Sequence, residues 1–83
     1  MLTPQGPASY YCGQPSKLAT QLELGGYAPI PIKSEHETAR YHRGASFVIL
    51  YRNGTVLLQG SDLETPRRLF ARLVEAEQQH LPF

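Results

Sequence analysis

The sequence predicts a small single-domain α+β protein, with an antiparallel sheet of three or four strands and two helices packed on one face, in the order helix, strand, strand, strand, helix. Three observations lead to this fold class. Two β-prone segments, residues 46–52 and 55–59, flank an Asn53-Gly54 pair, which is typical of a β-hairpin turn. Segments with apolar residues at helical spacing precede and follow this hairpin. The length of 83 residues leaves room for one hydrophobic core.

Composition narrows the classes of function. Hydrophobic residues make up 41% and charged residues 18%, which favours a globular chain over a disordered one. Eight Lys and Arg residues against seven Asp and Glu residues give a net charge of +1. This balance excludes a strongly basic protein that holds nucleic acid mainly through phosphates, so any such binding needs a local patch.

The single cysteine, Cys12, excludes a disulfide framework and a zinc site built from cysteines. The sequence carries no signal-peptide pattern in residues 1–13, and its longest apolar stretch, residues 47–51, is far too short for a membrane span. We therefore expect a soluble protein in a reducing, cytoplasmic setting.

The N-terminal segment, residues 1–15, is rich in proline and glycine, which oppose a long regular element. Within it, residues 8–12 favour a short strand, because Tyr10 and Tyr11 are strand-prone. We therefore expect residues 1–15 to be either loose or strand-forming.

The first helix is expected to begin at Ser16, whose side chain can cap it. Leu18 and Leu22 recur at helical spacing and should be buried. The Gly25-Gly26 pair ends the helix.

Two further extended segments lie between this helix and the hairpin. Residues 27–32 alternate proline with apolar residues, which indicates a connector or an edge strand. Residues 38–43 alternate as a strand does, with Ala39 and Tyr41 on one face. The opposite face carries Thr38, Arg40 and His42.

A two-residue type I′ turn at Asn53-Gly54 would pair Leu50 with Leu57 and so assign the faces of the hairpin. One face is then wholly apolar or aromatic and is expected to meet the helices: Phe47, Ile49, Tyr51, Val56 and Leu58. The other is half apolar and half polar and is expected to stay open: Ser46, Val48, Leu50, Arg52, Thr55, Leu57 and Gln59.

The second helix is expected to start with Thr65 as its N-cap and Pro66 at its first position, and to run to about residue 79. Its buried stripe is Leu69, Phe70, Leu73 and Val74. Arginines lie off that stripe at positions 67, 68 and 72. They are compatible with a phosphate contact, but an ordinary solvated helix face is the simpler interpretation.

Residues 38–72 resemble the N-terminal domain of ribonuclease HIII, which has the fold of the TATA-binding protein. The resemblance is carried by Tyr41 with its strand, by Tyr-Arg-Asn-Gly-Thr-Val-Leu-Leu-Gln-Gly at residues 51–60, and by the amphipathic helix that follows. It implies a sheet whose exposed concave face meets nucleic acid. It does not extend to the catalytic domain of that family.

The order of elements also resembles the double-stranded RNA-binding domain and the HicA-type toxin. Arg67-Arg68 corresponds to the basic start of the last helix in the first family. Ser34-Glu35-His36 corresponds to the histidine-bearing turn of the second, without its glycine. Both resemblances cover fewer matching residues than the one above.

The expected open face is therefore the candidate binding site, for nucleic acid or, alternatively, for a partner protein that this chain would serve as an inhibitor, antitoxin or accessory subunit. A third interpretation is that the N-terminal segment, with Tyr10 and Tyr11, covers this face. The expected site residues are Arg40, His42, Arg43, Val48, Leu50, Arg52, Thr55, Leu57 and Gln59. Pairing of an edge strand with a second copy would give a homodimer.

We expect no enzyme, cofactor or metal site. His36 and His42, with Glu35 and Glu37, are more consistent with solvated polar residues than with a nuclease. The histidines also lack a spacing that would bring them together on one ion.

Overall fold

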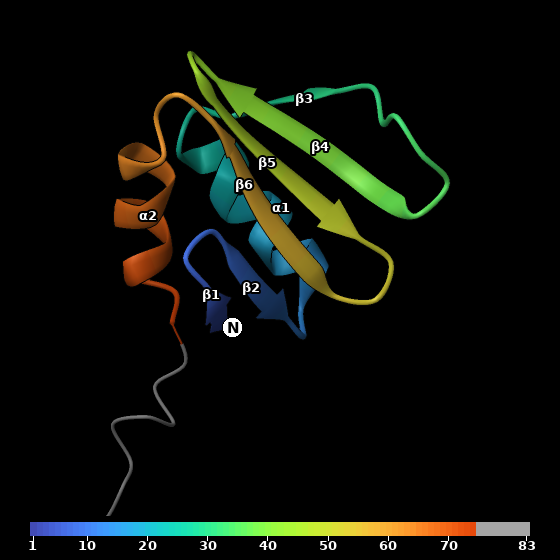
Figure 1. Cartoon of the computed structure of the whole chain (residues 1–83), viewed down its shortest axis with the longest axis horizontal. Coiled ribbons are helices and arrows are strands. Elements are labelled where there is room, and N and C mark those ends of the chain that lie inside the picture. Colours follow the sequence, from blue (N-terminus) through green and yellow to red (C-terminus); the bar gives the residue numbers. More distant parts are fainter. Residues whose placement is uncertain (75–83) are drawn as a thin grey trace, which may run out of the picture.

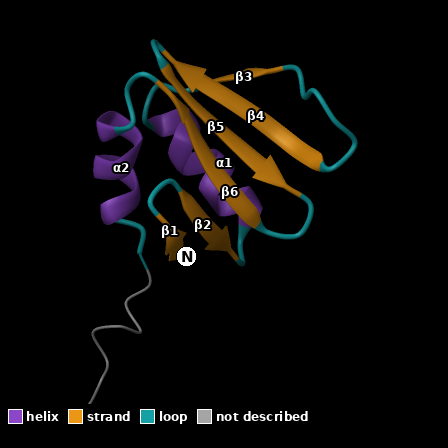
Figure 2. Cartoon of the chain, viewed as in Figure 1, coloured by secondary structure: helices purple, strands orange, loops and turns teal. Residues whose placement is uncertain are grey.

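The structure, a computed structural model, describes residues 1–74 and shows a six-stranded antiparallel sheet with two helices (Figures 1 and 2). The elements are β1 (Leu2–Gly6), β2 (Ser9–Cys12), α1 (Pro15–Leu24), β3 (Ala28–Ile30), β4 (Glu37–Arg43), β5 (Ser46–Tyr51), β6 (Thr55–Gly60) and α2 (Glu64–Ala71). The strands lie side by side in the order β1-β2-β6-β5-β4-β3. The α+β class is confirmed, whereas three or four strands in helix-strand-strand-strand-helix order is wrong.

The N-terminal segment accounts for most of this difference, because it forms the hairpin β1–β2. The short strand expected at residues 8–12 is present as β2, and it pairs with β6. Strand β1 was not predicted, because residues 1–15 are rich in proline and glycine, but a proline such as Pro4 is tolerated on an edge strand, and β1 lies at the edge of the sheet. The Leu2 amide donates a hydrogen bond to the Leu73 carbonyl (3.0 Å), which ties β1 to the segment after α2.

The N-cap of helix α1 lies two residues earlier than expected. Gln14 is its N-cap residue and Pro15 opens it, so Ser16 lies inside the helix and does not cap it. Leu18 and Leu22 are fully buried, as predicted. The helix ends before Gly25, also as predicted.

The strands on the other side of β5 follow the sequence pattern. Strand β3 is one of the two outer strands of the sheet, which confirms the second of the two predictions for residues 27–32, a connector or an edge strand. In β4, Tyr41 is buried and Ala39 packs against the core. Arg40 and His42 point to the opposite face, as the alternation predicted.

The turn of the central hairpin has three residues instead of the expected two. The Gly54 amide donates to the Tyr51 carbonyl (3.0 Å), and the Thr55 amide donates to Oδ1 of Asn53 (2.9 Å). Gly54 has φ of +94°, the left-handed conformation that closes a three-residue hairpin loop.

This extra loop residue shifts the pairing of β5 with β6 by one position. Leu50 pairs with Val56, where Leu57 was expected, and Val48 pairs with Leu58. A one-residue shift exchanges the faces of one strand. Val48 and Leu50 of β5 therefore lie on the same face as Val56 and Leu58 of β6. The predicted faces of β5 are wrong, whereas those of β6 hold.

Both helices pack on the face of the sheet that carries Val48 and Leu50, with α1 seen behind the strands in Figure 1. Cys12 and Tyr27 lie in this core, and the thiol of Cys12 is free. The buried residues of the core are Leu2, Cys12, Leu18, Leu22, Tyr27, Tyr41, Val48, Leu50, Val56, Leu58, Leu69 and Phe70.

Helix α2 begins at Glu64, with the side chain of Asp62 in place of the predicted Thr65 cap. The Asp62 carboxylate accepts hydrogen bonds from the amide (3.1 Å) and the hydroxyl (2.7 Å) of Thr65. Leu69 and Phe70 are buried, as predicted. The helix ends at Ala71, short of residue 79, and residues 75–79 lie outside the described part of the chain. In residues 1–74, neither helix has the length and apolar character needed to cross a bilayer.

Candidate functional site

The sheet face opposite the helices, which we call the open face, carries apolar and aromatic side chains together with several polar ones. Its members follow from the register, since they alternate with the core residues along each strand. They are Tyr11 on β2, Arg40 and His42 on β4, Phe47, Ile49 and Tyr51 on β5, and Thr55, Leu57 and Gln59 on β6.

The structure brings some of the predicted site residues together on this face and places others elsewhere. Those on the open face are Arg40, His42, Thr55, Leu57 and Gln59. Val48 and Leu50 are 0% and 3% exposed and belong to the core, so their predicted placement on the open face is wrong. Arg43 lies on the helix side, where Nη1 donates to the Gly25 carbonyl (3.2 Å). Arg52 lies in the hairpin turn, at one end of the open face.

The prediction missed the aromatic residues of the open face, Tyr11, Phe47 and Tyr51. The ring of His42 stacks on that of Phe47, with 6.0 Å between the ring centroids and 26° between the planes. Tyr11 is 44% exposed. Reading residues 52–54 as a three-residue loop would have placed Phe47 and Tyr51 on this face from the sequence.

Ile49 lies at the centre of the open face and is nevertheless fully buried. No helix covers it, so the neighbouring side chains of the same face enclose it. The open face is therefore packed at its centre and presents its aromatic rings around that centre.

An ion pair fixes the β4 side of the open face. Nε and Nη2 of Arg40 donate to the two carboxylate oxygens of Glu37 at 2.9 and 3.1 Å. The Lys33 amide and the Ser34 hydroxyl also donate to this carboxylate, each at 3.3 Å. The hydrogen bonds from Arg40 contribute most to lowering the pKa of Glu37 from its ordinary value of 4.5. Arg40 is thereby held in position, and its charge is largely balanced.

A cavity of about 370 Å³ adjoins the open face at the hairpin turn, lined by His36, Tyr51, Arg52 and Asn53. The Arg52 amide donates to the His36 carbonyl (2.9 Å), and the Arg52 side chain donates to the Glu35 carbonyl. These bonds hold the loop before β4 against the turn. The cavity thus combines one aromatic wall with a polar rim.

Within residues 1–74, no three His, Cys, Asp or Glu side chains come close enough to hold a metal ion. The two histidines weighed as nuclease residues have separate surroundings: His42 stacks on Phe47, whereas His36 accepts a hydrogen bond through its backbone.

Comparisons with protein-family models, with curated proteins and with solved structures found no match to this chain. The resemblance to the N-terminal domain of ribonuclease HIII therefore stays a prediction from residues 38–72, and the function is argued from the open face.

Proposed function

We propose that this protein binds single-stranded nucleic acid on the open face of its sheet, without catalysing a reaction. The observation that carries the proposal is the set of aromatic rings, Tyr11, Phe47 with His42, and Tyr51, on the face that neither helix covers. Unpaired bases stack on such rings whatever their sequence, because every base has a π face.

The spacing of the strands suits a short oligonucleotide. Tyr11 on β2 and His42 on β4 are separated by three strand-to-strand steps, and each step is about 4.8 Å, so the platform is about 14 Å wide. Thr55 and Gln59 on β6 offer hydrogen-bonding groups between the aromatic positions. The cavity beside Tyr51 could receive one base at the end of the strand.

Electrostatic attraction to phosphates has a small part in this proposal. The charge of Arg40 is balanced by Glu37, and Arg52 is the other arginine near the open face. With at most two such contacts, the logarithm of affinity should fall with the logarithm of salt concentration with a slope no steeper than about −1.4. Stacking should therefore dominate the affinity.

The test is a fluorescence-anisotropy titration of labelled single-stranded DNA, single-stranded RNA, duplex DNA and RNA–DNA hybrid at low and high salt. We expect micromolar binding to single strands and weaker binding to duplexes. The double variant Tyr11→Ser/Tyr51→Ser should lose at least about tenfold in affinity, since each stacked base contributes about 1–3 kcal/mol. The matched control is Leu24→Ser, which removes an apolar side chain that is 77% exposed on α1.

Binding that survives in the folded double variant would contradict the proposed surface. Absence of binding to every oligonucleotide at low salt would contradict the proposed function and favour the alternative, a protein partner on the same apolar face. Pairing of edge strands with a second copy is the less favoured form of that alternative. Pro4 on β1 and Pro29 on β3 lie on the two outer strands, where proline interrupts the hydrogen bonds that a partner strand needs.

A further inference from the structure

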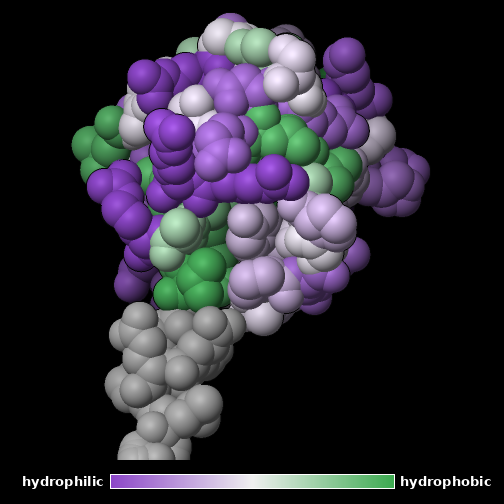
Figure 3. Space-filling view, turned by 60° about the vertical axis from the view of Figure 1, so that its left-hand side comes forward, coloured by the Kyte–Doolittle hydropathy of each residue, from purple (hydrophilic) through white to green (hydrophobic). Residues whose placement is uncertain are grey.

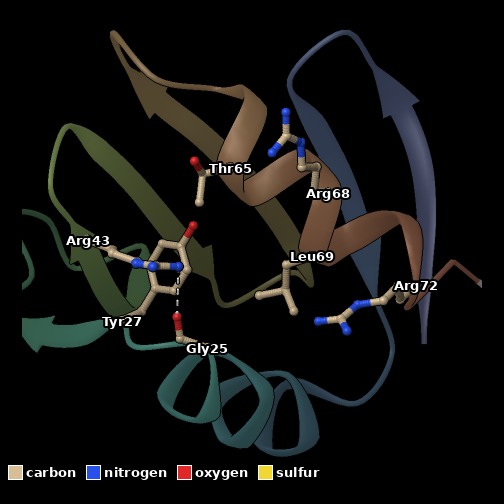
Figure 4. A pocket seen from close by; sticks show the side chains of 7 residues that line it. All are labelled: Gly25, Tyr27, Arg43, Thr65, Arg68, Leu69 and Arg72. Carbon is tan, nitrogen blue, oxygen red and sulfur yellow. Dashed lines mark hydrogen bonds between the residues drawn. The ribbon is translucent and has the colours of Figure 1, made fainter.

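A second cavity, of about 470 Å³, lies on the helix side of the molecule, away from the open face (Figure 4). It is enclosed by the end of α1, the end of β4 and one side of α2. Its lining residues are Gly25, Tyr27, Arg43, Thr65, Arg68, Leu69 and Arg72. The proposed function uses none of them.

Three arginines line this cavity. Figure 4 shows Arg43 and Arg72 extending toward it from opposite sides, with Arg68 in the last turn of α2 and Arg72 directly after the helix. Arg68 and Arg72 carry like charges four residues apart, and an anion between them would offset their mutual repulsion. None of the described residues that line the cavity is acidic. Figure 3 shows the mainly hydrophilic surface of this side of the molecule, with smaller hydrophobic areas.

Structural demands of the fold account for only one of these three charges. Arg43 donates to the Gly25 carbonyl at the end of α1 (3.2 Å) and so supplies a hydrogen-bond donor to a carbonyl that has none within the helix. Arg68 and Arg72 are exposed, and no hydrogen bond or ion pair joins either side chain to another residue of the described segment 1–74. These two guanidinium groups are therefore available to a ligand.

The floor of the cavity supplies an independent indication. Tyr27 is 4% exposed, and its hydroxyl has no hydrogen-bond partner among the described residues. The Ser46 hydroxyl beside it donates instead to the Asp62 carbonyl (2.7 Å). Burial raises the pKa of Tyr27 more than the nearby Arg43 lowers it, so the phenol keeps its proton at neutral pH. In Figure 4 this hydroxyl points toward Thr65, across the cavity.

We propose that this cavity binds the phosphate group of a small phosphomonoester. Arg68 and Arg72 would hold the phosphate oxygens, while Tyr27 would donate a hydrogen bond from its hydroxyl. Leu69 and the ring of Tyr27 provide an apolar wall for the rest of the ligand. The volume exceeds that of phosphate alone and lies in the range of small-molecule sites.

The test is isothermal titration calorimetry of the full chain with inorganic phosphate, glycerol 3-phosphate, glycerol and sodium acetate, none of which carries a base that could stack on the open face. We expect millimolar or tighter binding of the two phosphates, stronger for the monoester, and no binding of glycerol or acetate. The double variant Arg68→Gln/Arg72→Gln should weaken phosphate binding at least about tenfold, because it removes two charged donors. The matched control Lys17→Gln, which removes an exposed positive charge on α1, should leave it unchanged.

Tyr27→Phe separates a ligand-binding role from a structural one. The variant should bind phosphate several-fold more weakly, yet unfold in phosphate-free buffer at the same temperature or a higher one, because it removes a buried hydroxyl that lacks a partner. Loss of stability together with unchanged phosphate affinity would overturn the role of Tyr27. Failure of both phosphates to bind at millimolar concentration, or binding that persists in Arg68→Gln/Arg72→Gln, would overturn the proposal. Neither result bears on the oligonucleotide titration, which concerns the other side of the sheet.

Discussion

The two faces of β5 are both apolar, but they are buried in different ways. Val48 and Leu50 lie beneath α1 and α2, in the core that both helices share. Phe47, Ile49 and Tyr51 point away from the helices, and only Ile49 is fully buried there. An antiparallel sheet with one solvated face ordinarily carries polar residues on that face. The apolar character of the open face is therefore not a requirement of the core, and it points to a surface that something else contacts.

The same comparison explains why the two faces of β5 were predicted the wrong way round. A strand with apolar side chains on both sides gives no periodic signal of which side is buried. In β4 the signal was present, because Arg40 and His42 alternate with Ala39 and Tyr41, and the prediction was confirmed. The faces of a strand are therefore assigned reliably from the alternation of polar and apolar residues, and not from hydrophobicity alone.

Leucine truncation on the two faces gives the largest expected difference. Leu50→Ala removes a side chain that is 3% exposed in the core and should destabilise the protein by about 2–5 kcal/mol. Leu57→Ala removes a half-buried side chain of the open face and should cost only about 1 kcal/mol. Urea denaturation followed by circular dichroism measures both free energies. Equal losses would mean that the open face is as tightly packed as the core.

The sequence carried enough information for most elements, and the errors have local causes. Both helices, the edge position of β3 and the central hairpin were predicted from spacing, proline and turn residues. Strand β1 was not predicted, because the prolines and glycines of residues 1–15 were taken to oppose a long regular element, although an edge strand tolerates a proline such as Pro4. The open face was misassigned because Asn53-Gly54 favours a two-residue turn, whereas Arg52 joins them in a three-residue loop.

The candidate site was less predictable than the fold, since it depends on that single register. Arg40, His42 and Leu57 reached the open face as expected, because their positions follow from β4 and β6. The aromatic residues Phe47 and Tyr51 were assigned to the core by the same shift that placed Val48 and Leu50 on the surface. The cavity of the three arginines joins segments far apart in the sequence, and no local pattern brings Arg43 to Arg68 and Arg72.

Gly54 links the turn to the open face, and its substitution should have an intermediate effect. Its φ of +94° is unfavourable for residues with a Cβ, and a Cβ there would overlap the ring of Tyr11. Gly54→Ala should therefore destabilise the protein by about 1–3 kcal/mol and move Tyr11. The matched variant is Gly44→Ala, with φ of +57° and open space around a Cβ, which should cost about 1 kcal/mol.

Thermal unfolding ranks the two glycine variants by stability, and the fluorescence of the tyrosines reports any displacement of Tyr11. A larger loss in Gly44→Ala than in Gly54→Ala would show that the overlap with Tyr11 is relieved at little cost. It would thereby weaken the placement of that ring at the end of the open face. Similar tyrosine signals in both variants would lead to the same conclusion.

The ion pair of Glu37 with Arg40 gives the smallest expected effect and the only one that depends on pH. Because the pKa of Glu37 is lowered in the folded state, chiefly by the hydrogen bonds from Arg40, the unfolded chain takes up the proton first as pH falls. The stabilisation is therefore fully present above the ordinary value of 4.5 and is lost as pH falls through the lowered folded-state value.

Glu37→Gln should accordingly be less stable than the unmodified protein between pH 6 and 8, and the difference in unfolding temperature should shrink below about pH 4.5. Glu23→Gln on α1 is the control, because Glu23 is exposed and no ion pair joins it to another residue in segment 1–74. Its difference from the unmodified protein should stay small throughout. If the difference in unfolding temperature between Glu37→Gln and the unmodified protein were independent of pH, the carboxylate would act by packing alone. Arg40 would then be free to meet phosphate, and the salt dependence of oligonucleotide binding should be steeper than the balanced charge allows.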